Sequence, residues 1–204
     1  MGFDTDLPGD LTDDDRLFNV DRGPWEMNTR MDWSFLREYR YIAGFERAAQ
    51  VLGDRAAESG ADVDALTMPI LFCYRQWAEL QLKALWSNGS RLIGREQTPY
   101  TTHDLRVLWR HVRPIVETVW PDGDRTELDR LERVLHELAD FDGPRGIGFR
   151  YATDKNGRAS LPSELTINLG NVRSVMEKAA LLLNGAAEGI TELLSYTEED
   201  MQEY

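Results

Sequence analysis

The chain has 204 residues, of which 42% are hydrophobic and 29% are charged, and this composition suits one ordinary globular domain. Its single cysteine, Cys73, excludes a disulfide framework and a cysteine-based zinc site, and it lies in an apolar run that predicts a small buried residue. The formal net charge of −13 opposes long-range attraction of nucleic acid to the whole molecule.

The negative charge is concentrated at the two ends of the chain. Residues 1–36 contain 9 acids and 3 bases, and residues 191–204 contain 5 acids and no base. The remaining residues are nearly neutral, so a local basic patch there can still bind phosphate. No apolar run reaches the length of a membrane span, and the first residues lack the order of a signal peptide. We therefore expect a cytoplasmic protein.

Hydrophobic periodicity predicts two helices in the first half of the chain. The Asp-, Gly- and Pro-rich residues 1–24 are expected to be irregular. From Trp33 apolar residues recur at spacings of three and four, which predicts a helix that ends at Gly53 and Ser59-Gly60. A second helix is expected from Val63 to Trp86, with Asn88-Gly89-Ser90 as its stop signal.

The second half predicts three more helices and one hairpin. Their expected ranges are 101–120, with a kink at Pro114, then 125–140, and finally 171–196. Between the last two, Phe149–Ala152 and Arg158–Leu161 flank Asp154-Lys155-Asn156-Gly157, which indicates a small β-hairpin. We expect an all-α fold, a single bundle of about five helices over residues 37–196 with this hairpin before the last helix. Residues 1–36 would form an acidic arm, and residues 197–204 an acidic tail.

The second helix is apolar almost all round, which is typical of a helix at the centre of a bundle. Its few polar residues, Arg75, Glu79 and Lys83, fall on one stripe at 100° per residue. The stripe is either a solvated edge or a polar groove that faces a ligand or partner. The two interpretations predict different burial for Glu79 and Lys83.

Three motifs within these predicted elements resemble the HEPN-domain family. Glu79-Leu80-Gln81-Leu82-Lys83 resembles the E-x-x-L-K helix of that family, His103-Asp104-Leu105 resembles its H-[DN]-L segment, and Phe149-Arg150-Tyr151 resembles its F-R-Y segment. Their order and spacing agree over residues 37–195. The resemblance implies an all-helical bundle, frequent dimerisation, and a role in RNA cleavage, toxin–antitoxin pairs or phage defence.

Catalytic members of this family carry an arginine followed, after four to six residues, by a histidine. The resemblance therefore implies a metal- and cofactor-independent ribonuclease with Arg106 and His111 as catalytic residues, where histidine moves protons and arginine holds phosphate. In a regular helix these two residues point about 140° apart, so both reach one phosphate only across a dimer or a helix break. Arg130 and His136 match the same spacing. The three histidines offer no credible metal site.

A second arrangement uses the outer face of the third helix. On helical geometry His103, Arg106, Arg110 and Arg113 share one ridge opposite the apolar face, and Arg150 with Tyr151 add a basic and aromatic patch. This ridge is either a solvated face that answers nearby acids or a track for RNA phosphates with Tyr151 or Trp109 as a stacking platform.

The leading hypothesis is a HEPN-like protein that binds or cleaves RNA in a toxin–antitoxin or phage-defence pair. Its partners would be RNA and either a second copy or a cognate protein, with no membrane. The first alternative is a non-catalytic HEPN-like dimerisation or interaction module. The second is an acidic inhibitor that mimics nucleic acid, which would require acids aligned on one ordered face.

Overall fold

Five helices form nearly all the regular structure of the computed structural model, which describes residues 17–18, 24–29, 37–96, 101–143 and 146–202. By its internal contacts the chain divides between Arg37 and Glu38. The short N-terminal unit contains the 3-10 helix η1 (Trp25–Met27), and the larger unit, residues 38–204, is the helical bundle. The predicted all-α class with five helices is confirmed, while the predicted boundaries at residues 36 and 196 stay a prediction.

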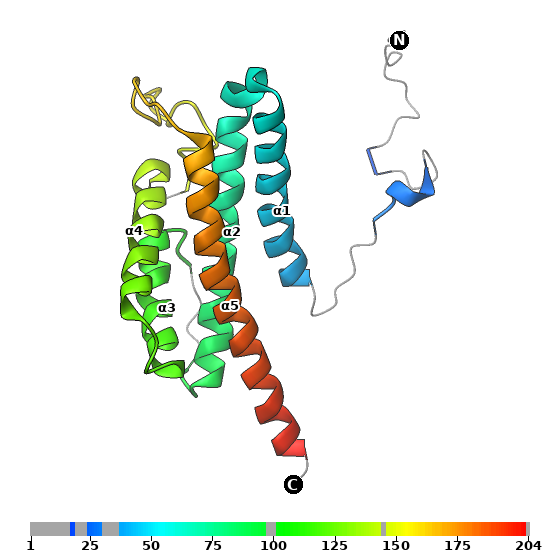
Figure 1. The fold of residues 1–204 in the computed structure, drawn as a ribbon, viewed down its shortest axis with the longest axis vertical. Helices are drawn as coiled ribbons and strands as arrows, with labels where there is room; N and C mark the ends of the chain where they lie inside the picture. Colours follow the sequence, from blue (N-terminus) through cyan, green and yellow to red (C-terminus); the bar gives the residue numbers. More distant parts are fainter. Residues whose placement is uncertain (1–16, 19–23, 30–36, 97–100, 144–145, 203–204) are drawn as a thin grey trace. The chain divides into compact units, whose positions relative to one another are not determined.

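The second helix is central, as its apolar composition predicts. Helix α2 (Val63–Leu92) packs against both α3 (Leu105–Val119) and α5 (Leu169–Gln202), and α4 (Arg125–Asp142) packs on α3 (Figure 1). Ile70, Trp77 and Leu82 of α2 are completely buried. Burial of large apolar side chains on every side of one helix supplies most of the driving force for the bundle.

Helix α1 (Arg37–Glu58) closes the other side of α2 (Figure 1). The rings of Phe45 and Phe72 meet edge to face with centroids 6.1 Å apart. Arg173 of α5 donates to Asp54 at 2.7 Å, which ties α1 to α5 as well. Cys73 is buried, as expected for a small apolar residue.

The predicted end of α2 and the predicted start of α3 are wrong for physical reasons. α2 continues through Asn88-Gly89-Ser90 to Leu92, because Gly89 is a packing residue and not a stop: a Cβ there would lie 2.4 Å from Cγ2 of Ile115. α3 begins at Leu105 and not at Thr101, since Asp104 is its N-cap and accepts a hydrogen bond from the Arg106 N–H at 2.9 Å. The helix then continues through Pro114.

α5 is longer than predicted at both ends. It begins at Leu169 and runs to Gln202, so most of the predicted acidic tail is helical. The residues after Tyr196 contain no glycine or proline, and polar composition alone does not end a helix. In Figure 1 the last turns of α5 extend past the other helices of the bundle.

The predicted β-hairpin is not formed. Among the described residues there is no strand, and Thr153 and Ala159 make one isolated antiparallel bridge. Oδ1 of Asp154 accepts the N–H groups of Asn156 and Arg158, so a side chain organises this turn. The flanking residues are mostly exposed, and a two-stranded ribbon without packing on one face is marginal at best.

No helix within the described ranges combines the length and apolar character that crossing a membrane requires.

Candidate functional site

The polar stripe of α2 is buried, so its interpretation as a solvated edge is wrong. Arg75 and Glu79 expose only 3% and 2% of their surfaces, and the side chain of Lys83 exposes 13%. Ionised groups are costly to bury unless they are paired and hydrogen-bonded. The elements around α2 must therefore supply partners.

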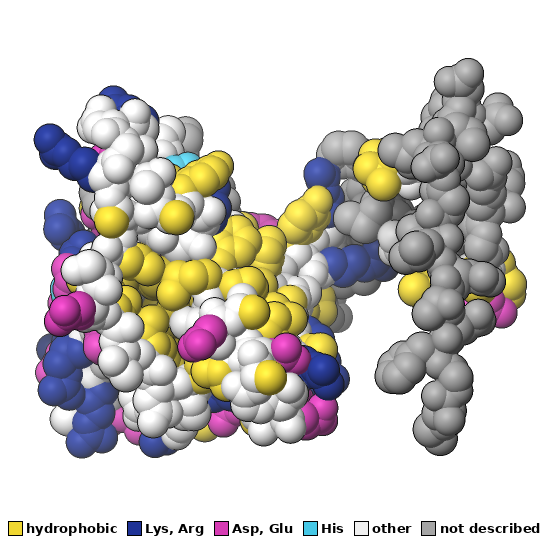
Figure 2. All heavy atoms as spheres, turned by 90° about the horizontal axis from the view of Figure 1, so that it is seen from above, with side chains coloured by type: hydrophobic (Ala, Val, Ile, Leu, Met, Phe, Trp, Pro, Cys, Tyr) yellow, Lys and Arg dark blue, Asp and Glu magenta, His cyan; other side chains and the backbone are white. Residues whose placement is uncertain are grey.

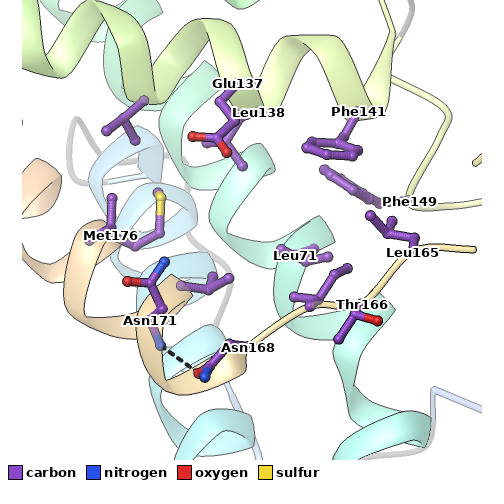
Figure 3. Close-up of a pocket in the computed structure, with 14 residues that line it drawn as sticks. Leu71, Glu137, Leu138, Phe141, Phe149, Leu165, Thr166, Asn168, Asn171 and Met176 are labelled. Atoms are coloured by element: carbon purple, nitrogen blue, oxygen red, sulfur yellow. Dashed lines mark hydrogen bonds between the residues drawn. The ribbon is translucent and has the colours of Figure 1, made fainter.

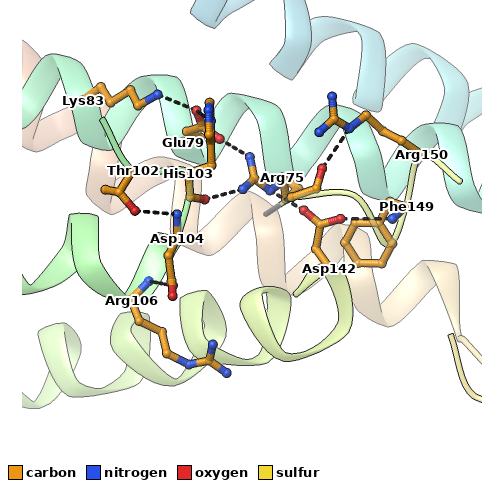
Figure 4. A network of polar contacts seen from close by, with 11 residues as sticks. Arg75, Glu79, Lys83, Thr102, His103, Asp104, Arg106, Asp142, Phe149 and Arg150 are labelled. Atoms are coloured by element: carbon orange, nitrogen blue, oxygen red, sulfur yellow. Dashed lines mark hydrogen bonds and ion pairs between the residues drawn. The ribbon is translucent and has the colours of Figure 1, made fainter. Parts of the chain in front are cut away.

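Glu79 accepts three charge-assisted or polar hydrogen bonds. Arg75 donates to Oε2, while Nζ of Lys83 and Nδ1 of His103 donate to Oε1 at 2.5 Å and 2.8 Å (Figure 4). Burial by itself raises the pKa of this carboxyl, but the hydrogen bonds from Lys83, Arg75 and His103 outweigh it and hold the pKa below its ordinary value. Glu79 is therefore ionised at neutral pH.

Arg75 joins three segments of the chain. Its Nε lies 2.5 Å from Oδ2 of Asp142 at the end of α4, and its Nη2 donates to the backbone carbonyl of His103. Asp142 in turn accepts the backbone N–H of Phe149 on Oδ1 at 3.0 Å (Figure 4). With Glu79 and Lys83 the group holds two cations and two anions, so it is neutral without any charge on His103. We call Arg75, Glu79, Lys83, His103 and Asp142 the ionic network.

Two glycines let the chain pass close to this network after α4. Gly146 has φ +64°, and a Cβ there would lie 2.5 Å from Nη2 of Arg75. A Cβ on Gly148 would lie 2.6 Å from the carbonyl oxygen of Phe141. Neither Asp142 nor these glycines were predicted as site residues. The dense glycines of residues 143–148 were the available signal, because closely spaced glycines mark close backbone approach.

All three motifs that resemble the HEPN family meet at the ionic network. Glu79 and Lys83 come from the E-x-x-L-K segment, and His103 comes from the H-D-L segment. The backbone N–H of Phe149 in the F-R-Y segment binds Asp142, and Nε of Arg150 donates to the Gly146 carbonyl at 2.8 Å. These motif residues therefore tie α2 to the segments before α3 and after α4.

Two arginines of the predicted ridge on α3 pair with acids of α4, as the interpretation of a face that answers nearby acids expects. Arg106 pairs with Asp140, and Arg113 pairs with Asp129 and Glu132 at 2.6 Å and 2.5 Å. Glu117 also binds Arg113, and these carboxylates raise the pKa of its guanidinium further above the ordinary range. Helical geometry alone did not identify α4 as the helix that carries those acids.

His103 does not belong to that ridge, since it precedes the N-cap of α3. Arg110 is exposed and has no ion pair within the described residues. Arg150 is exposed as well, with its guanidinium carbon 5.9 Å from the centroid of the Tyr151 ring, and 58% of Tyr151 is exposed. Of the residues predicted to bind RNA, Arg110 and the neighbouring Arg150 and Tyr151 are therefore exposed.

Arg106 and His111 have different neighbours. While Arg106 binds Asp140 of α4, the imidazole of His111 stacks on Trp86 of α2 with ring centroids 4.1 Å apart and an interplanar angle of 5°. The other spacing match places His136 only 3.9 Å from Glu132, on its own helix. Within one copy, Arg106 and His111 are therefore engaged by different partners.

A partly open cavity of about 230 Å³ lies between α4, the start of α5 and the segment before it (Figure 3). Its walls are mainly apolar, with Leu138, Phe141, Phe149 and Met176 among them, and Asn171 donates its backbone N–H to Asn168 at its edge. The end of the bundle seen in Figure 2 is hollowed, with hydrophobic side chains inside the hollow. The sequence did not predict this cavity.

Among the described residues no three histidine, cysteine, aspartate or glutamate side chains gather as a metal site would require. No protein-family model matches the chain, and neither the curated proteins nor the solved structures contain a detectable relative. The chemistry of the molecule must therefore be inferred from its own residues.

Proposed function

We propose that the chain is a HEPN-like helical interaction module, with a second copy as its partner, and that it does not cleave RNA through Arg106 and His111. The family resemblance that motivates this proposal implies frequent dimerisation as well as ribonuclease activity. The geometry of the site residues favours the first of these over the second.

The observation that carries the proposal is the occupation of both candidate catalytic groups. The guanidinium of Arg106 binds a carboxylate, and the ring of His111 stacks on Trp86. A phosphate-binding arginine must offer its donors to the substrate, and binding at Asp140 competes with that. Arg113 is bound by three carboxylates, which offset the positive charge that would attract RNA phosphates to this face.

The end of α5 offers a surface for association. Leu193 and Tyr196 are 40% and 56% exposed and lie three residues apart, on the same side of the helix. These turns extend past the other helices (Figure 1), so a second molecule can approach them. Apolar residues at such spacing are how a helix inserts into a groove or pairs with another helix.

The ribonuclease half of the proposal is tested with labelled single-stranded RNA at low salt. We expect the wild type, Arg106→Ala and His111→Ala to leave the RNA equally intact over hours. Cleavage by the wild type that is lost in His111→Ala would overturn the proposal, because a stacked structural histidine has no such role.

The association half is tested by light scattering over a range of protein concentrations. We expect a concentration-dependent dimer that becomes monomeric in the double variant Leu193→Glu, Tyr196→Glu. Ser195→Glu adds one such negative charge on another face of the same turn and should leave the dimer intact. A wild type that stays monomeric at every concentration contradicts this half.

A further inference from the structure

The imidazole of His103 is exposed to solvent on one side and held by a buried carboxylate on the other. The side chain is 62% exposed, yet its Nδ1 donates to a carboxylate that is almost fully buried, Glu79, at 2.8 Å. Because Nδ1 is held at the buried side, the opposite edge of the ring, with Nε2, faces outward. Within the described residues Nε2 has no hydrogen-bond or ion-pair partner.

The imidazole is not the only contact that holds this segment against α2, and the charges of the network balance without it. Nη2 of Arg75 donates to the backbone carbonyl of His103, and any residue at position 103 could accept that hydrogen bond. Arg75 and Lys83 already bind both oxygens of Glu79. The side chain of His103 is therefore available for chemistry that the fold does not require.

The carboxylate prepares Nε2 to act as a nucleophile. An ionised Glu79 keeps the ring proton on Nδ1, which leaves the lone pair on Nε2. When Nε2 forms a bond, the ring becomes positively charged, and the adjacent carboxylate stabilises that charge. A nucleophile and a group that orients it, within hydrogen-bond distance, is the general pattern of an activated side chain.

The surroundings of the ring favour an anionic electrophile. Nζ of Lys83 binds the same oxygen of Glu79 as His103 does, so an ammonium group lies beside the imidazole (Figure 4). α3 begins two residues later, and the N-terminal end of a helix carries partial positive charge. Phosphoryl groups fit both features.

We propose that Nε2 of His103 accepts a phosphoryl group from a small phosphoramidate-type donor. The Nε2 lone pair attacks phosphorus in a donor whose nitrogen is already protonated, the P–N bond breaks, and the neutral amine leaves with the electron pair of that bond. The proton on Nδ1 stays between the ring and Glu79. This activity is separate from partner binding, so either can fail without the other.

The test uses phosphoramidate as the probe on the full chain. Mass spectrometry at neutral pH would follow the acid-labile phosphoryl group at each of the three histidines. We expect His103 to react roughly tenfold faster than His136, because a hydrogen bond to a charged group is worth about 1.4 kcal/mol more than a neutral one, and this difference corresponds to a factor of ten in rate. Equal rates at the two residues, or no reaction at His103, would overturn the proposal.

A matched pair of variants separates activation from exposure. Glu79→Gln keeps the shape but removes the carboxylate charge, and we expect the rate at His103 to fall roughly tenfold. Glu132→Gln removes the carboxylate 3.9 Å from His136 and should leave the rate at His103 unchanged. Circular dichroism must show that each variant is folded; a folded Glu79→Gln that reacts at the wild-type rate also contradicts the proposal. If Glu79→Gln does not fold, the comparison of histidines in the wild type decides.

Discussion

At the scale of single residues, Arg75 and Asp142 form the most deeply buried ion pair described, with side chains 3% and 1% exposed. Removing one partner of such a pair leaves an uncompensated charge, which costs about 3–5 kcal/mol. We expect Asp142→Asn to lower the free energy of unfolding in urea by about 3 kcal/mol. Its neighbour Asp140 is 69% exposed in its pair with Arg106, so Asp140→Asn should cost less than about 1 kcal/mol. Equal losses in the two variants would contradict this ranking.

Glu79 makes stability depend on pH in a defined direction. Its pKa is lower in the folded chain than its ordinary value of 4.5, since the hydrogen bonds from Lys83, Arg75 and His103 outweigh desolvation. The stabilisation is fully present above that ordinary value and is lost as pH falls through the lower, folded pKa. We expect the urea midpoint to fall as the pH is lowered below the ordinary value of 4.5, and to fall less steeply in Glu79→Gln. A variant with the wild-type slope would assign the acid sensitivity to other carboxyls, such as Glu132, whose pKa is also lowered.

At the scale of elements, the connection between α4 and α5 depends on Gly146. A side chain there would face two costs: a left-handed φ of +64° and a Cβ 2.5 Å from the buried guanidinium of Arg75. Gly157 shares the first cost, with φ +76°, but a Cβ there would meet nothing within 4 Å. Gly157→Ala should therefore cost about 1–2 kcal/mol, and Gly146→Ala clearly more. Thermal unfolding of both variants checks this; similar losses would mean that Arg75 moves aside.

Helical periodicity predicted the five helices and the central place of α2, because an apolar stripe or surface depends only on neighbouring residues in sequence. Helix ends were less predictable. Gly89 lies in a sequence typical of a helix end, yet it is inside α2, where the absence of a side chain leaves room for Ile115 of α3. The site was predicted only in part. Arg75 and His103 stood out as polar residues in segments predicted to be helical, but Asp142 completes the network from a distant part of the chain.

The arginine ridge of α3 shows the same limit: periodicity places a residue on one helix but does not show what the neighbouring helix presents to it. Periodicity correctly placed Arg106 and Arg113 away from the apolar face of α3. It gave no information on what α4 would present to them, and that helix brings Asp129, Glu132 and Asp140. A face without apolar residues is a solvated surface only when no neighbouring element carries complementary charge.

At the scale of the whole molecule, charge is unevenly distributed. Residues 1–36 carry 9 acids and 3 bases, almost half of the net charge of −13, and they fall outside the larger contact unit that contains the bundle. Negative charge on one part of a chain can repel nucleic acid from another part, and salt screens this effect beyond about 8 Å at physiological ionic strength. A lack of RNA binding by the full chain could therefore come from this charge or from the paired arginines.

Deleting residues 1–36 separates the two causes. Arg106 and Arg113 keep their carboxylate partners on α4 in the shortened chain. If these ion pairs are what prevents RNA binding, the shortened chain should still fail to bind labelled single-stranded RNA at about 0.15 M salt. Fluorescence anisotropy measures this, and an unchanged circular dichroism spectrum confirms that the bundle is retained. Binding that appears only after the deletion would mean that the acidic residues repel RNA from a competent surface. RNA recognition through exposed groups such as Arg110 would then explain the function of this bundle better.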